Sequence, residues 1–160
     1  MSLLAFKRRV RTPTILQMEA VECGAACLAM VLAHFGKWVP LEELRIRCGV
    51  SRDGSNALNV LKAARSYGLE AQGMKVDMDG LPTLPMPLIL FWEFNHFVVL
   101  EGLDGRGAHI NDPALGRRTL SLEAFSGSFT GVALRLAPGP EFERGGRRPA
   151  LLPALRRRLE

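Results

Sequence analysis

The chain has 160 residues, of which 48% are hydrophobic and 23% are charged. This length suits one domain, and the composition excludes disorder, collagen and coiled coil for the chain as a whole. No apolar run reaches the roughly 18 residues that cross a bilayer. The first basic residues follow a short apolar stretch, which is the reverse of a secretion signal. We therefore expect one domain with no membrane span and no secretion signal.

The formal net charge of +5 is concentrated at the two ends of the chain. Four basic residues lie within residues 1–11 and six within residues 138–160, whereas residues 12–137 carry 11 basic and 13 acidic side chains. A domain with this slightly acidic centre is not expected to bind nucleic acid. The basic ends suit an acidic partner or an anionic membrane surface, and plain solvation explains them equally well.

The chain divides into three predicted segments. Residues 1–11 form a basic N-terminal arm, and residues 12–137 form the domain. Residues 138–160 are rich in proline, glycine and arginine, a composition that marks a linker or tail.

The first half of the domain is predicted to be helical. The segment from Cys23 to Phe35 is a nearly unbroken apolar run, which is typical of a helix buried in a core. A short helix begins at Pro40, with proline and acidic residues in its first turn. A third helix runs from Ser55 to Tyr67 and ends before Gly68.

The second half of the domain is predicted to form strands. They cover residues 69–76, 88–91, 96–100, 108–111, 118–120 and 132–136. The strand that starts at His96 is apolar on both faces and is therefore expected to lie at the centre of the sheet. Helices followed by strands indicate an α+β fold.

Three cysteines occur in the chain, at Cys23, Cys27 and Cys48. An odd number of cysteines without a secretion signal favours reduced thiols in the cytosol. No Cys-x-x-Cys pair is present, and the three histidines do not cluster with the cysteines in the sequence. We therefore expect no metal and no cofactor.

Cys23 is the candidate nucleophile, because it lies where the first predicted helix begins. Unpaired backbone N–H groups and the positive end of the helix dipole favour a thiolate over a thiol at such a position. Gly24 leaves room for an incoming carbonyl group. Cys27 follows one turn later within the apolar run, so we expect it in the core, as we do Cys48.

A nucleophilic thiolate needs an imidazole that shares its proton and later protonates the leaving amine. His96 is the preferred candidate, because it opens the predicted central strand. His34 lies at the far end of the first helix, roughly 17 Å along the axis from Cys23, and cannot reach the sulfur. The sequence does not determine which face of its predicted strand His109 occupies.

Asp112 is the candidate carboxylate that orients the imidazole of His96. A hairpin centred on Asp104 and Gly105 pairs position 96 with about position 113, which brings Asp112 within reach. Asp104 itself lies at the tip of the turn. Glu101 is out of phase with His96 in the alternation of the strand.

An oxyanion hole completes the predicted site. The backbone N–H of Cys23 supplies one donor, and the side-chain amide of Gln17 supplies another if the loop between them folds back. Each residue also has a structural alternative, since Cys23 and His96 can be ordinary core residues. Asp112 can form an Asx turn before Pro113, and Gln17 can be a polar loop residue without a function.

Several segments of the chain resemble the double-glycine leader peptidases that process bacteriocins. They are Gln17 to Met30, Val39 to Leu44, Ser51 to Ser55, Asn95 to Gly102 and Asn111 to Gly116. The resemblance covers about residues 12–137 and is closest to the branch that serves ribosomally made peptide natural products. Those enzymes are papain-like cysteine peptidase domains, usually fused to the N-terminus of an ABC exporter.

The resemblance implies a papain-like α+β fold, in which N-terminal helices pack on a C-terminal antiparallel sheet. It implies Cys23 as the nucleophile, His96 as general base and acid, and Asp112 as the orienting carboxylate. Gln17 and the backbone N–H of Cys23 then form the oxyanion hole.

The implied reaction is cleavage of a precursor peptide after the Gly-Gly site of its leader. The implied partners are that precursor peptide and the transmembrane and nucleotide-binding parts of an ABC exporter. These partners place the domain in the cytoplasm, at the cytoplasmic face of the inner membrane when it is part of a transporter.

Two other functions are left open by the sequence. One is a non-catalytic leader-binding docking module of an exporter. Failure of a cysteine-reactive electrophile to label Cys23 would favour this function. The other is a different papain-like amide hydrolase, which would turn over amides that lack Gly-Gly.

Overall fold

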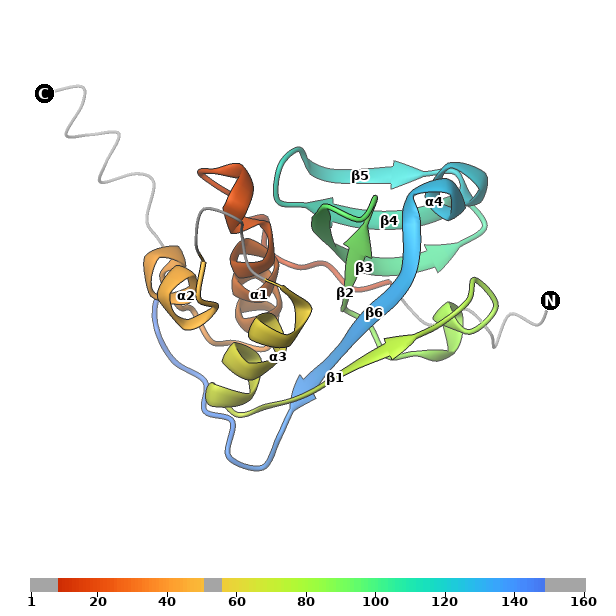
Figure 1. The fold of residues 1–160 in the computed structure, drawn as a ribbon. Helices are drawn as coiled ribbons and strands as arrows, with labels where there is room; N and C mark the ends of the chain where they lie inside the picture. The colour runs from red at the N-terminus through yellow and green to blue at the C-terminus, as the bar shows by residue number, and fades with distance from the viewer. Residues whose placement is uncertain (1–8, 51–55, 149–160) are drawn as a thin grey trace, which may run out of the picture.

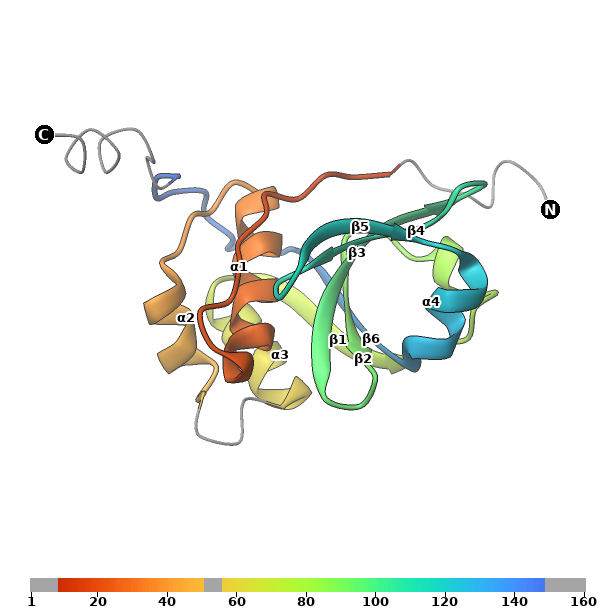
Figure 2. The ribbon, with the colours of Figure 1, turned by 90° about the horizontal axis from the view of Figure 1, so that it is seen from above.

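The computed structural model of the chain describes residues 9–50 and 56–148. In this part of the chain three helices pack on one face of a six-stranded antiparallel sheet, and a fourth lies on the other face (Figure 1; Figure 2). The helices are α1 (Cys23–His34), α2 (Leu41–Arg47), α3 (Ala57–Ser66) and α4 (Leu122–Ser128). Two 3₁₀ turns are η2 (Ala20–Glu22) and η3 (Leu81–Thr83).

The sheet has the strand order β1-β6-β2-β3-β4-β5. The strands are β1 (Leu69–Lys75), β2 (Leu88–Trp92), β3 (His96–Asp104), β4 (Gly107–Asp112), β5 (Gly116–Leu120) and β6 (Phe129–Pro138). Sequential strands β2 to β5 are neighbours, whereas β6 returns to lie between β1 and β2.

Helix α1 is the centre of the helical layer. All of its residues from Cys23 to Ala33 are buried, as expected for a helix that is apolar on every side. It packs against β3, α2 and α3. The predicted buried helix is therefore confirmed.

Strand β3 is buried on both faces of the sheet. Phe97 and Val99 belong to the core beneath the helices, whereas Val98 and Leu100 belong to a second core that includes Phe125 of α4. Strand β3 lies between β2 and β4, so its predicted central position is confirmed. This double burial holds the first residue of β3, His96, on a rigid element.

The segments that flank the domain also contact it. Residues 9–14 lie along the sheet, where the Val10 N–H donates to the Glu101 carbonyl oxygen at 3.0 Å. After β6, the Gly139 N–H donates to the Gly68 carbonyl at 2.9 Å, and the Trp38 N–H donates to the Gly145 carbonyl at 2.8 Å. Residues 1–8 of the predicted arm and 149–160 of the predicted tail lie outside the described residues, as does the stretch 51–55.

The predicted helices and strands are all present, but helix α4 was not predicted from the sequence. Its seven residues include two serines and a glycine, which are poor helix formers. A local N-cap and a tertiary contact stabilise it: the Ser121 hydroxyl accepts a hydrogen bond from the Ala124 N–H at 3.1 Å, and Phe125 is fully buried.

The register of the β3–β4 hairpin differs slightly from the prediction. The prediction centred the turn on Asp104 and Gly105, but Asp104 lies opposite Gly107, so the turn residues are Gly105 and Arg106. The register then shifts between Leu100 and Gly102, which sets Val99 opposite Asn111. This irregularity moves the pairing by one residue and still leaves Asp112 beside the start of β3. No helix within residues 9–50 and 56–148 is both long and apolar enough to cross a membrane.

Candidate active site

Cys23 is the first residue of α1 and lies where the helical layer meets the sheet. The 3₁₀ turn η2 runs directly into α1, so Cys23 sits in the first turn of a continuous helical segment. Its side chain is 8% exposed. It lies close enough to His96, the first residue of β3, to raise the pKa of that imidazole. The structure thus brings together two residues that lie 73 positions apart in the sequence.

Asp112, the last residue of β4, holds the other side of the same imidazole. The distance from His96 Nε2 to Asp112 Oδ1 is 2.8 Å, and Oδ1 also accepts the Ala114 N–H at 2.8 Å. The Asp112 side chain is only 3% exposed, so the carboxylate has little freedom to turn away. His96 is therefore hydrogen-bonded to Asp112 on one side and lies close to Cys23, which also raises its pKa.

The contacts of His96 with Asp112 and Cys23 shift the pKa values of both His96 and Asp112. Burial by itself lowers the pKa of His96, but the hydrogen bonds and charges of Asp112 and Cys23 outweigh it and raise this pKa to about 9. Burial likewise tends to raise the pKa of Asp112, and the bonds to His96 and the Ala114 N–H lower it overall. The imidazole is therefore cationic and Asp112 is ionised at neutral pH.

Gln17, the predicted oxyanion donor, lines the same space as His96 and Asp112. Its backbone N–H donates to the Pro113 carbonyl oxygen at 2.8 Å, which ties the loop before α1 to the turn after β4. The side-chain oxygen of Gln17 is buried and has no hydrogen-bond partner among the described residues.

A cleft of about 480 Å³ opens next to His96. It is lined by Gln17, Ala20, Trp92, Glu93, Asn95, His96, Asp112, Ala114, Leu115 and Arg118. Gln17, His96 and Asp112 thus line one solvent-accessible cleft. Cys23 is not in the lining but lies next to His96. The arrangement suits attack by a thiolate on a peptide carbonyl, with a proton donor and an amide alongside.

Glu22, immediately before Cys23, holds the loop that carries Gln17. Its buried carboxylate accepts the Met18 N–H at 2.8 Å and the Glu19 N–H at 3.3 Å. It also forms an ion pair with Arg45 Nε of α2 at 2.9 Å. The sequence carries no signal for this role, because a glutamate in a polar loop is usually solvated.

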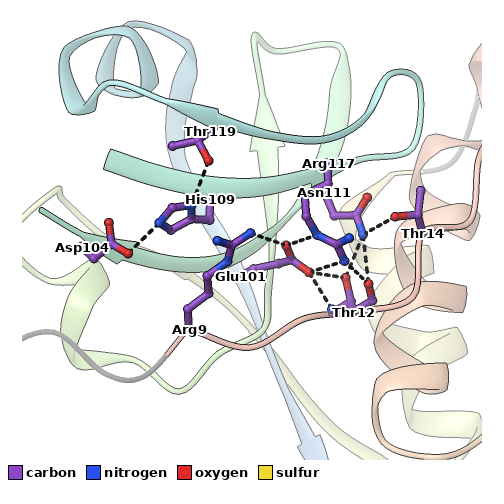
Figure 3. A network of polar contacts seen from close by, with 9 residues as sticks. All are labelled: Arg9, Thr12, Thr14, Glu101, Asp104, His109, Asn111, Arg117 and Thr119. Atoms are coloured by element: carbon purple, nitrogen blue, oxygen red, sulfur yellow. Dashed lines mark hydrogen bonds and ion pairs between the residues drawn. The ribbon is translucent and has the colours of Figure 1, made fainter. Parts of the chain in front are cut away.

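A second buried carboxylate, Glu101, anchors the N-terminal segment to the sheet (Figure 3). It accepts the Thr12 N–H at 2.6 Å and forms an ion pair with Arg117 Nε at 2.9 Å. The Asn111 amide donates to the Thr12 carbonyl at 3.2 Å and to the Thr14 hydroxyl at 3.2 Å. We call these five residues the anchor network; it connects the neighbour of Asp112 to the segment that leads to Gln17.

The remaining histidines and cysteines are not among the residues that line the cleft. His109 is buried and bonded to Asp104 at 2.7 Å and to Thr119 at 2.9 Å (Figure 3). His34 is the last residue of α1. Burial raises the pKa of Cys27, and burial raises the pKa of Cys48 to about 11, so both thiols are protonated. Their predicted places in the core are confirmed.

The chain is similar to known processing peptidases. Residues 11–141 match the Peptidase C39 family. The chain is 42% identical over 139 residues to the probable microcin-H47 secretion/processing ATP-binding protein of Escherichia coli, a match that covers 87% of this chain and 20% of that protein. It thus spans about a fifth of the length of the curated relatives it matches first.

Solved structures agree with this assignment. A double glycine motif protease from an AMS/PCAT transporter, crystallised with its leader peptide, is 58% identical with a TM-score of 0.81, covering 82% of this chain and 95% of that one. The peptidase domain of Streptococcus ComA is 29% identical with a TM-score of 0.75, covering 80% and 99%. The predicted family and α+β fold class are confirmed: the chain belongs to the peptidase C39 family of cysteine peptidases.

Proposed function

We propose that this peptidase cleaves the leader from a precursor peptide after a Gly-Gly site, with Cys23 as nucleophile. The observation that carries the proposal is the chain of contacts from Cys23 through His96 to Asp112 at the edge of a solvent-accessible cleft. Support for the Gly-Gly specificity comes from the double glycine motif protease, which is 58% identical.

In the proposed mechanism the thiolate of Cys23 attacks the carbonyl carbon of the second glycine. The Gln17 amide and the Cys23 backbone N–H bind the oxyanion that forms. Protonated His96 then gives its proton to the leaving amine, which releases the C-terminal product and leaves an acyl-enzyme. Water, deprotonated by His96, hydrolyses the thioester and restores the thiolate. Asp112 holds the imidazole in place throughout and stabilises its cationic form.

We also propose that the domain works on the cytoplasmic side of a membrane, together with the transmembrane and nucleotide-binding parts of an ABC exporter. This follows from the relatives, whose names combine processing with secretion and ATP binding, and of which the chain matches about a fifth. Its basic segments at either end suit contact with the anionic inner surface of that membrane.

The nucleophile is tested with Cys23→Ala and Cys23→Ser on a peptide that carries a Gly-Gly leader. We expect cleavage after the second glycine by the unaltered chain and none by Cys23→Ala, measured by mass spectrometry. Cys27→Ala is the matched control, because it removes a thiol one turn away that lies in the core. Cleavage at Gly-Gly by Cys23→Ala would end the assignment, and absence of turnover by the unaltered chain would favour a docking module instead.

A further inference from the structure

We propose that the cleft beside His96 binds the residues that follow the scissile bond, and that Arg118 makes it prefer an acidic side chain there. The inference rests on the proposed function, because it specifies which core peptides that same site accepts. It identifies Arg118 as a specificity-determining residue of this chain.

The position of the cleft indicates which part of the substrate occupies it. His96 must protonate the leaving amine, so the residues on the leaving side lie against the imidazole. The cleft is lined by His96, Asp112 and Gln17, whereas Cys23 is not in its lining. Its volume of about 480 Å³ falls within the range of peptide- and ligand-sized pockets.

Arg118 is the arginine in the wall of this cleft, and its charge is incompletely neutralised. Its nearest anion is Asp112, at 3.7 Å from the guanidinium, which is longer than a hydrogen bond. The same carboxylate already serves His96 and the Ala114 N–H, each at 2.8 Å. Arg118 Nε is buried and has no hydrogen-bond partner among the described residues, while 38% of the side chain is exposed.

The two carboxylates in the cleft lining, Asp112 and Glu93, are held by partners other than Arg118. Asp112 is buried and turned toward His96. Glu93 lies in the turn between β2 and β3, where its carboxylate accepts the Ser128 hydroxyl at 3.0 Å. An extended peptide presents successive side chains to opposite sides, so one side chain meets Arg118 while its neighbour meets the wall that holds Glu93.

The reach of Arg118 limits the preference to the first residues of the product. The guanidinium and the imidazole both lie next to the Asp112 carboxylate, at 3.7 Å and 2.8 Å. An extended chain advances about 3.3 Å per residue. An Asp or Glu within the first three residues after the cleavage site can therefore accept two parallel hydrogen bonds from the arginine fork.

The test uses leader peptides that end in Gly-Gly and continue with Asp at the first, second or third position, each paired with an Asn peptide. The ratio of kcat/KM for Asp over Asn is measured for the unaltered chain, for Arg118→Gln and for Arg118→Glu. Arg135→Gln is the matched control, because it removes the same charge from an exposed site on β6.

At one of the three positions we expect an Asp over Asn ratio of about fivefold or more, as for a hydrogen bond to a charged group. The ratio falls to one in Arg118→Gln, stays unchanged in Arg135→Gln, and falls below one in Arg118→Glu. Because any general effect of Arg118 on Asp112 acts on both peptides alike, the ratio isolates the subsite.

Equal rates for Asp and Asn at all three positions, or a preference that persists in Arg118→Gln, would overturn the subsite. In that outcome the Asn peptides are still cleaved after Gly-Gly, and the proposed function stands. If the unaltered chain cleaves none of the peptides, the proposed function and the subsite fall together.

Discussion

The imidazole of His96 lies between the Asp112 carboxylate and the Cys23 thiol. Its charge therefore affects both the stability of the fold and the proposed activity. The pKa of its imidazole in the folded chain, about 9, exceeds the ordinary value of 6.5. Because the folded value is raised, the stabilisation is fully present below pH 6.5 and is lost as the pH rises through about 9. The proposed mechanism also needs the cationic imidazole, so activity depends on the same titration.

We expect kcat/KM to fall as the pH rises above about 9, and Asp112→Asn to move this fall toward pH 6.5 and lower the maximal rate. The reason is that the neutral amide no longer stabilises the imidazolium. The measurement is a pH–rate profile on a Gly-Gly leader peptide. Asp104→Asn is the matched control, since it removes the carboxylate from the other His–Asp pair; an identical shift in both variants would contradict the role of Asp112.

Gln17 contributes one side-chain amide to the proposed oxyanion hole. We expect Gln17→Ala to lower kcat by about 10²- to 10³-fold with little change in KM, as for loss of one oxyanion donor. Gln72→Ala, which truncates an exposed glutamine on β1, serves as control in the same assay. A loss confined to KM, with kcat intact, would show that Gln17 binds the substrate in its ground state only.

The loop before α1 and the N-terminal segment are each held by a buried carboxylate that forms an ion pair. Glu22 connects the loop to α2 through Arg45, and Glu101 connects the N-terminal segment to β5 through Arg117. Burial raises the pKa of Glu101, but the bonds from Arg117 and Thr12 lower it overall, so this carboxylate stays ionised. These contacts fix the loop against α2 and the N-terminal segment against the sheet.

We expect Glu101→Gln to lower the free energy of unfolding by about 3–5 kcal/mol, because it leaves the half-buried Arg117 charge without its partner. Urea denaturation measures the loss, and Glu70→Gln, at an exposed glutamate of β1, is the control. Replacing Glu101 and Arg117 together with apolar residues should cost less than Glu101→Gln alone. Equal stability of Glu101→Gln and the unaltered chain would show that the ion pair contributes nothing.

At the scale of the whole molecule, the sheet separates two cores, and α1 connects the helical core to the site. Leu28 is fully buried in the middle of α1. Since β3 packs directly on α1, the distance between Cys23 and His96 depends on how closely this helix sits on the sheet. Packing in the core and geometry in the site are therefore coupled.

We expect Leu28→Ala to destabilise the fold by about 2–5 kcal/mol through the cavity it leaves. Leu58→Ala is the control, because this leucine is 53% exposed on α3. Thermal or urea unfolding of both variants measures the difference. Similar losses in the two variants would contradict the assignment of α1 as the centre of the core.

The sequence by itself determined the order of helices and strands, the buried character of α1 and β3, and the family. These follow from local patterns: an unbroken apolar run, Gly and Pro at the boundaries, and residue types in a specific order. It also singled out Cys23, Gln17, His96 and Asp112, because nucleophilic chemistry requires those groups.

Only the tertiary structure decided the burial of Glu22 and Glu101, the formation of α4, and the place of Arg118 beside Asp112. From a short stretch of sequence, a carboxylate is expected at the surface. The burial of Glu22 and Glu101 is stable only because Arg45 and Arg117, which are distant in the chain, pair with them. Arg117 and Arg118 are adjacent in sequence, yet the alternation of β5 sends one to the anchor network and the other to the cleft. Which neighbour faces which partner is set by strand pairing over long distances, and a local pattern does not contain that information.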